Sequence, residues 1–155
     1  MKPTSPCPCG ASKPYSECCA VFHKGLREAP NAEALMRSRY SAFATSDVDY
    51  LFRTLHPDHE DLNVPEAELR ESLRRSARSH KYMGLTILDH QPPDAQGIAH
   101  VLFLAKVFEN GKNVSFIELS TFAHDGVGWR YLSGTSRPAP KQSADLGAMK
   151  IDTFA

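Results

Sequence analysis

The four cysteines constrain the folding of this chain most, because all of them lie between residues 7 and 19. Disulfides that stabilise a secreted fold are normally spread along the chain. The sequence also begins without the apolar stretch of a secretory signal, so we expect a cytoplasmic protein. Clustered thiols in that setting are typical of a metal site. Residues 1–24 cannot bury a hydrophobic core, so bound metal would supply the folding energy of this module.

The spacing of the cysteines suits one tetrahedral ion. Cys7 and Cys9 can wrap a metal if the chain turns sharply, and the neighbouring proline and glycine favour such a turn. The adjacent pair that follows eight residues later can donate both sulfurs at the bend into a short helix. Four thiolates favour zinc. The predicted ligands of Zn²⁺ are Cys7, Cys9, Cys18 and Cys19.

Other interpretations of the cluster stay open at this point. His23 could replace Cys19 as the fourth ligand, and spacing alone does not separate zinc from iron. The neighbouring cysteines could instead form a redox pair. Free structural thiols are disfavoured, because this segment has no apolar interior in which to bury them.

Composition narrows the class of protein. With 155 residues and 41% hydrophobic residues, the chain suits one ordinary globular domain and a small appendage. No apolar run approaches the ~20 residues of a membrane helix. Basic and acidic residues balance at 18 each, so no bulk field attracts nucleic acid or anionic lipid. The arginines within 65–79 could contact RNA or phosphate, but a solvated face is the favoured interpretation.

Hydrophobic periodicity then predicts helices followed by strands. Helices are expected from Asn31, from Asp47 to the His56-Pro57 stop, and over 65–79. Antiparallel strands are expected over residues 82–89, 98–109, 112–124 and 129–133, with Asn110-Gly111 as a hairpin turn. The fold class is therefore α+β, with three helices on one face of a four-stranded meander. The domains are a zinc module over 1–24, an α+β domain over 30–135 and a loosely ordered tail over 136–155.

Two motifs carry a resemblance to known families. Pro6-Cys7-Pro8-Cys9-Gly10, with Tyr15 and Cys18-Cys19, resembles the SEC-C zinc motif. The segments 32–43, 47–51 and 54–57 resemble the bacterial YchJ family, which joins a SEC-C motif to a domain similar to nuclear transport factor 2 (NTF2). The resemblance implies a cone whose helices close one side of a curved sheet. The family often has a His-Glu pair in the penultimate strand, where this chain has Ile117-Glu118, so only the glutamate carries over.

The interior of the cone is a second candidate site. Strand alternation places Glu118 on one face with Phe116, Ser120 and Phe122. Arg39 falls inside the apolar stripe of its helix, and a buried arginine needs a partner. We therefore expect Arg39 and Glu118 to meet inside the cone. The predicted ligand-binding residues are Arg39, Tyr40, Glu118 and Trp129.

These features predict a zinc-binding adaptor. The module would engage a protein partner, with the ribosome or a nucleic acid as the other possible partner, while the cone binds a small ligand or acts as a scaffold. The alternative is a small-molecule enzyme that uses Glu118 with Tyr40, Tyr50 or His56. A third interpretation is a homodimer formed through the sheet. The resemblance itself implies no particular activity.

Overall fold

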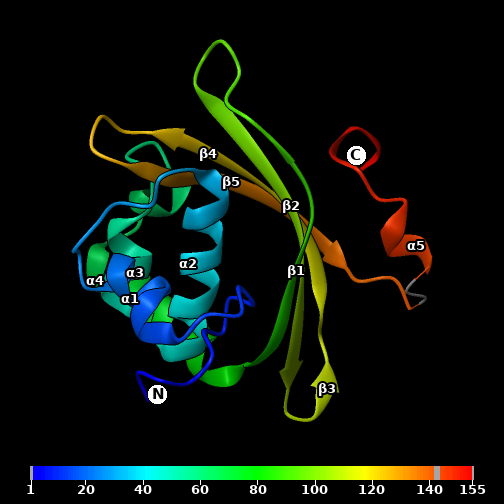
Figure 1. The fold of residues 1–155 in the computed structure, drawn as a ribbon. Coiled ribbons are helices and arrows are strands. Elements are labelled where there is room, and N and C mark those ends of the chain that lie inside the picture. The colour runs from blue at the N-terminus through cyan, green and yellow to red at the C-terminus, as the bar shows by residue number, and fades with distance from the viewer. Residues whose placement is uncertain (1, 142–143, 155) are drawn as a thin grey trace.

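The computed structural model describes residues 2–141 and 144–154, and its helices lie on one side of a curved antiparallel sheet (Figure 1). At the N-terminus, the 3₁₀ turn η1 (Tyr15–Glu17) and helix α1 (Cys19–His23) precede the longer helices. These are α2 (Ala32–Thr45), α3 (Val48–Arg53) and α4 (Glu66–Ser79), with a 3₁₀ turn η2 (Glu60–Asn63) before α4. The predicted α+β class is confirmed. Within the described residues, no helix has the length and apolarity needed to cross a membrane.

Local sequence signals explain where the helices begin and end. The Asn31 side chain accepts a hydrogen bond of 2.8 Å from the Ala34 N–H at the start of α2. Ser46, with φ of 58°, ends that helix in the left-handed conformation. Asp47 then caps α3 by accepting from the Tyr50 N–H. The C-cap of α2 and the N-cap of α3 are adjacent residues, so the two helices form a tight corner.

The sheet has five strands rather than the four that the periodicity predicts. They are β1 (Lys81–Gln91), β2 (Ile98–Glu109), β3 (Lys112–Asn113), β4 (Phe116–His124) and β5 (Trp129–Pro138), in the order β1-β2-β4-β5 with β3 beside β2. The predicted single strand over 112–124 is interrupted because Ser115 replaces backbone ladder bonds. Its Oγ accepts from the Val107 N–H at 3.0 Å, and its own N–H donates to Asn113 Oδ1. The predicted turn at Asn110-Gly111 is confirmed, with positive φ at both residues.

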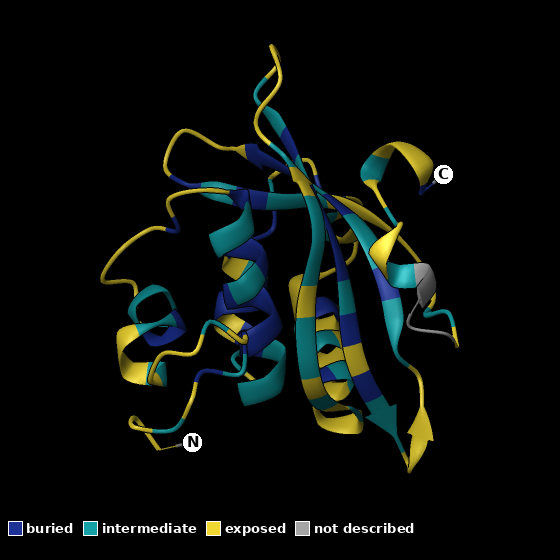
Figure 2. Ribbon diagram, turned by 45° about the vertical axis from the view of Figure 1, so that its right-hand side comes forward, coloured by how far each residue is buried: buried dark blue, intermediate teal, exposed yellow. Residues whose placement is uncertain are grey.

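The main core lies between α2 and the inner face of the sheet, where the buried segments concentrate (Figure 2). Strand alternation places the odd-numbered residues of β2 against the helices. The buried residues of β2 on this face are Ala99, Val101, Phe103, Ala105 and Val107. The even-numbered residues, including Leu102, point to the outer face.

The chain after residue 135, for which the sequence predicts a loosely ordered tail, lies along this outer face where it is described. Residues 136–138 continue β5, and helix α5 (Ala144–Gly147) and the 3₁₀ turn η3 (Ile151–Thr153) lie on the side opposite the helices (Figure 1). Phe154 is 3% exposed and packs in a cluster with Leu102 and Ile117. Residues 142, 143 and 155 of the predicted tail, and Met1 of the predicted zinc module, lie outside the described residues.

Candidate functional site

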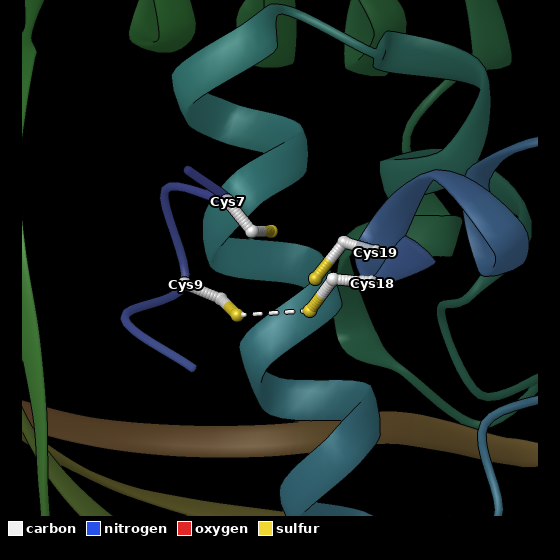
Figure 3. Close-up of side chains that lie close together, drawn as sticks. All are labelled: Cys7, Cys9, Cys18 and Cys19. Atoms are coloured by element: carbon white, nitrogen blue, oxygen red, sulfur yellow. Dashed lines mark hydrogen bonds between the residues drawn. The ribbon is translucent and has the colours of Figure 1, made fainter. Parts of the chain in front are cut away.

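The four cysteine side chains converge at the N-terminus (Figure 3). Their sulfur atoms all lie within 4.8 Å of one another, and Cys9 Sγ lies 3.5 Å from Cys18 Sγ. Three of the four residues are buried, and Cys9 is fully so. A tetrahedral zinc with Zn–S bonds of ~2.3 Å separates its sulfurs by about 3.8 Å. The four sulfurs therefore have the spacing of a metal-binding site.

Backbone hydrogen bonds within the N-terminal loop shape this site. The Cys7 N–H donates to the Lys13 carbonyl at 2.8 Å, and the Gly10 N–H donates to the Cys7 carbonyl at 3.2 Å. Gly10 has a φ of 81°, which glycine adopts without strain. The second pair of cysteines follows η1 and begins α1. The loop and the helix thus present two sulfurs each from opposite sides, as Figure 3 shows.

The electrostatics of the four thiols fit a bound cation. Hydrogen bonds from Cys19 and Cys9 lower the pKa of Cys7 to about 2. Burial raises the pKa of Cys18 to about 12, and the hydrogen bond to Cys7 raises that of Cys19. Without a cation, ionising one thiol opposes ionisation of its neighbours. A dication would offset this repulsion, and four sulfur donors suit a thiophilic one such as zinc. No other group of metal-ligating side chains gathers in the part of the chain that the structure describes.

His23 is not among the converging side chains. Its Nε2 donates to the Ser38 carbonyl at 2.8 Å, so its Nδ1 accepts from the Tyr15 hydroxyl at 2.6 Å. Burial lowers the pKa of His23, which agrees with this neutral form. The residue therefore connects the cysteine module, hereafter the knuckle (residues 2–24), to α2. Arg37 adds a second connection by donating from Nη1 to the Cys9 carbonyl at 2.7 Å.

A cavity of about 260 Å³ lies inside the cone. It is bounded by α2, α4 and the inner face of the sheet, and apolar side chains line most of it. The predicted face of β4 is confirmed, because Phe116, Glu118, Ser120 and Phe122 all line the cavity. The other lining residues are Met36, Arg39, Tyr40, Phe43, Leu55, Asp61, Leu73, Ser76, His80, Tyr82, Phe103, Val107 and Tyr131.

Polar groups gather at one end of this cavity around Glu118. Its Oε2 accepts hydrogen bonds from the Ser120 hydroxyl and, at 2.8 Å, from the Tyr131 hydroxyl. Burial, together with the neighbouring Glu118 charge, raises the pKa of Tyr131 and keeps its phenol protonated. Gly134 lies beneath this pair, and a Cβ there would overlap both Glu118 Oε2 and the Tyr131 hydroxyl. The absence of a side chain at residue 134 makes room for the arrangement.

Arg39 and Glu118 line the same cavity inside the cone, as expected, but they form no direct ion pair. No ion pair joins them among the described residues, because Arg39 instead donates to the Leu51 carbonyl at 2.8 Å and to Thr54 Oγ1 at 2.7 Å. Tyr131 connects the two residues. The guanidinium of Arg39 lies 4.8 Å from the centre of its ring, while its hydroxyl reaches Glu118. Both charges still line the same cavity.

The other predicted pocket residues divide between the cavity and the surrounding core. Tyr40 lines the cavity, and its hydroxyl accepts from the Gly84 N–H at 2.9 Å. Trp129 is not a lining residue and packs edge-on against His124, with ring centres 5.7 Å apart. Tyr50 and His56 do not line the cavity either, since the Tyr50 hydroxyl bonds to Ser38 and His56 Nδ1 accepts from the Asp58 N–H.

Two contributors to the polar end are not indicated by the sequence. Asp61 lines the cavity from η2, and His59 packs against Tyr131 with ring centres 5.2 Å apart. Both belong to an irregular segment, so no periodicity indicates which way they point. The sequence signals for this end of the cone are a glutamate on a strand face rich in aromatic side chains and an arginine in the apolar stripe of a helix.

Comparison with known proteins agrees with this architecture. Residues 31–134 match the family model of the YchJ middle NTF2-like domain. The UPF0225 protein YchJ of Shigella dysenteriae serotype 1 (strain Sd197) is 40% identical over 129 residues, which is 83% of this chain and 82% of that protein. This knuckle and cone thus define a SEC-C motif protein with an NTF2-like domain. The chain belongs to the YchJ family.

Solved structures show the same arrangement. The solution structure of a SEC-C motif protein from Rhodopseudomonas palustris has a TM-score of 0.73 and 30% identity, covering 84% of this chain and 98% of that one. The crystal structure of a SEC-C motif protein from Psychrobacter arcticus has a TM-score of 0.71 and 28% identity, covering 90% of this chain and 87% of that one. An NTF2-like protein from Streptomyces avermitilis shares only the fold, with a TM-score of 0.52 and 16% identity over 78% of this chain and 96% of that one.

Proposed function

We propose that this protein is a zinc-binding adaptor, in which Zn²⁺ on Cys7, Cys9, Cys18 and Cys19 stabilises a knuckle that recognises a protein partner. The observation that carries the proposal is the convergence of four cysteine sulfurs within 4.8 Å. Four protein ligands leave a tetrahedral metal no open position for substrate. The metal would therefore have a structural role, and the cytoplasm, where thiols stay reduced, would preserve its ligands.

The surface of the knuckle supports recognition. Its cysteines are mostly buried, whereas Lys2, Lys13 and Glu17 are exposed around them. The hydrogen bonds of His23 and Arg37 hold this surface against α2. A partner would thus meet a pre-ordered set of polar groups, which reduces the entropy cost of binding. The cone domain would support the knuckle and bind a small ligand of its own.

Elemental analysis of the purified protein tests the metal site. We expect one zinc per chain in the unchanged protein and a marked loss in Cys18→Ser, because a hydroxyl is a poor substitute for a thiolate ligand. Ser16→Ala, on the exposed side of η1, is the matched control and should keep its zinc. Four titratable free thiols without metal, or iron in place of zinc, would contradict the proposal.

Crosslinking in a cell extract tests the adaptor role. The full chain and its Lys13→Glu variant would be compared with Lys141→Glu, which makes the same charge change on an exposed residue far along the chain. We expect Lys13→Glu alone to lose specific crosslinks, since electrostatic complementarity governs encounter at such surfaces. Identical crosslinks for all three proteins would reject the knuckle as the recognition surface.

The cavity favours a second candidate function, a small-molecule enzyme. The specific observation is that the Glu118 carboxylate accepts hydrogen bonds from Ser120 and Tyr131 within a mostly apolar enclosure. A carboxylate in such surroundings can act as a base towards a bound substrate. Turnover of a bound molecule that stops in Glu118→Gln would support this function.

A further inference from the structure

We propose that the cavity binds a neutral, largely apolar molecule of about ten non-hydrogen atoms, whose single polar group both donates and accepts a hydrogen bond, as a primary carboxamide does. This inference rests on the part of the proposed function that gives the cone a small ligand. It does not depend on the zinc site, which lies in the knuckle.

The size of the ligand follows from the volume of the cavity. An apolar cavity of ~150 Å³ accommodates benzene, with six carbon atoms. The cavity of this protein is about 260 Å³. The same volume per atom gives about ten non-hydrogen atoms. A ring with one short substituent meets this limit.

The side chains that line the cavity favour an apolar, planar ligand. Phenylalanines approach from both the helices and the sheet, and Phe103 and Phe116 meet edge to face with ring centres 6.2 Å apart. Offset and edge-on contacts of this kind favour aromatic ligands. The aromatic lining residues are Tyr40, Phe43, Tyr82, Phe103, Phe116, Phe122 and Tyr131.

At the polar end of the cavity, Glu118 provides an acceptor and Arg39 provides donors. Glu118 receives both of its hydrogen bonds from described residues on Oε2, which leaves Oε1 as an acceptor for a ligand. Arg39 is 7% exposed, and both of its hydrogen bonds to described residues use Nη1. Its Nε and Nη2 groups thus remain as donors, and a buried guanidinium favours an acceptor for them. A group with both an N–H and a carbonyl satisfies the two residues together.

The charges around this end favour a neutral ligand over either ion. A carboxylate would be attracted by Arg39 but repelled by Glu118 and by Asp61, which also lines the cavity. An ammonium group would pair with Glu118 and Asp61 but be repelled by Arg39, and its burial would cost the hydration of a full charge. A carboxamide has the dipole to interact with both sides without burying an additional charge.

Four probes with a similar ring test the inference: benzamide, benzoate, benzylamine and ethylbenzene. Binding at pH 7.5 would be followed by the amide shifts of cavity residues in ¹H–¹⁵N NMR spectra of the full-length protein. We expect benzamide to bind tightest, with at least about tenfold higher affinity than benzoate, since unfavourable burial of charge opposes the ion. Equal or tighter binding of any other probe would overturn the inference, as would the absence of cavity shifts with benzamide.

Glu118→Gln separates this selectivity from general apolar binding. Removing the negative charge should weaken benzamide and strengthen benzoate, so that the affinity ratio between them falls by about fivefold or more. Glu71→Gln makes the same change on the outside of α4 and should leave the ratio unchanged. An unchanged ratio in Glu118→Gln would overturn the assignment of this residue as the acceptor. Zinc content measured on the same samples distinguishes failure of the ligand inference from failure of the metal proposal.

Discussion

His59 shows how a single residue of the irregular segment before α4 helps to build the polar end of the cavity. Its Nδ1 accepts from the Asp61 N–H at 3.0 Å, and its ring packs on Tyr131. The residue is 8% exposed, and burial lowers its pKa below the ordinary histidine value. His59 is therefore neutral in the folded protein while Arg39 lies nearby. Its protonation would place a second cation beside Tyr131.

This burial predicts a loss of stability in acid. Below pH ~6.5 the unfolded chain protonates His59 before the folded protein does, so the unfolded state binds more protons. The contribution of neutral His59 is complete above that pH and is lost as the pH falls, by at most about 1.4 kcal/mol per pH unit. Urea unfolding at pH 7.5 and 5.5 should show a smaller acid loss in His59→Gln, which keeps an acceptor for Asp61. An NMR titration midpoint for His59 at or above 6.5 would contradict this prediction.

The sequence predicts individual site residues best where a local period decides their direction. The cysteine spacing indicates the four converging sulfurs, and strand alternation places Glu118 in the cone. The partner of Arg39 could not be predicted in this way. The hydrogen bonds of Arg39 go to residues at the end of α3. Tyr131 lies between Arg39 and Glu118, next to a shift in the β4–β5 register at Thr121 and Phe122. Such three-dimensional details do not follow from the period of one element.

At the scale of elements, the junction between the knuckle and α2 determines whether the two parts move together. Two polar connections, Arg37 to the Cys9 carbonyl and His23 to the Ser38 carbonyl, join them. The sequence indicates α2 and its cap at Asn31 clearly, yet it gives no reason to orient Arg37 towards the knuckle. It only places Arg37 outside the apolar stripe. A side chain outside the apolar stripe can either face solvent or contact another element, and the sequence does not distinguish the two.

Arg37→Gln should loosen this junction without unfolding the cone. The variant loses the 2.7 Å bond to the Cys9 carbonyl, which corresponds to about 1–2 kcal/mol of docking free energy for a hydrogen bond from a charged donor. Hydrogen exchange should therefore accelerate in residues 2–18 and remain unchanged in β2 and β4. Glu33→Gln is the control, because it removes the ion pair of Arg37 within α2 but leaves the bond to Cys9. Equal exchange in the two variants would show that the Cys9 contact does not hold the knuckle.

At the scale of the whole molecule, the sheet is covered on both faces by different parts of the chain. The helices cover the inner face, while the described part of the C-terminal segment covers apolar side chains on the outer face. Polar contacts fix the segment as well, since the Ile151 N–H donates to Asp89 Oδ2 at 3.0 Å and Arg137 lies 4.0 Å from the Phe154 ring centre. The sequence predicts the sheet but not this cover, because the apolar residues of the segment have no regular period.

Phe154→Ala should release this segment and make the protein self-associate. The ring is 3% exposed, so its removal takes away the fully enclosed apolar contact of this segment with Leu102 and Ile117. An uncovered, apolar sheet face favours association with a second copy. Analytical ultracentrifugation should show a concentration-dependent dimer or larger species for Phe154→Ala, and more of it than for the unchanged protein. Val127→Ala, which shortens a side chain that is 69% exposed in the β4–β5 turn, should not change the oligomeric state. If Phe154→Ala has the same oligomeric state as the unchanged protein at all concentrations, the C-terminal segment is not what prevents association through the outer face.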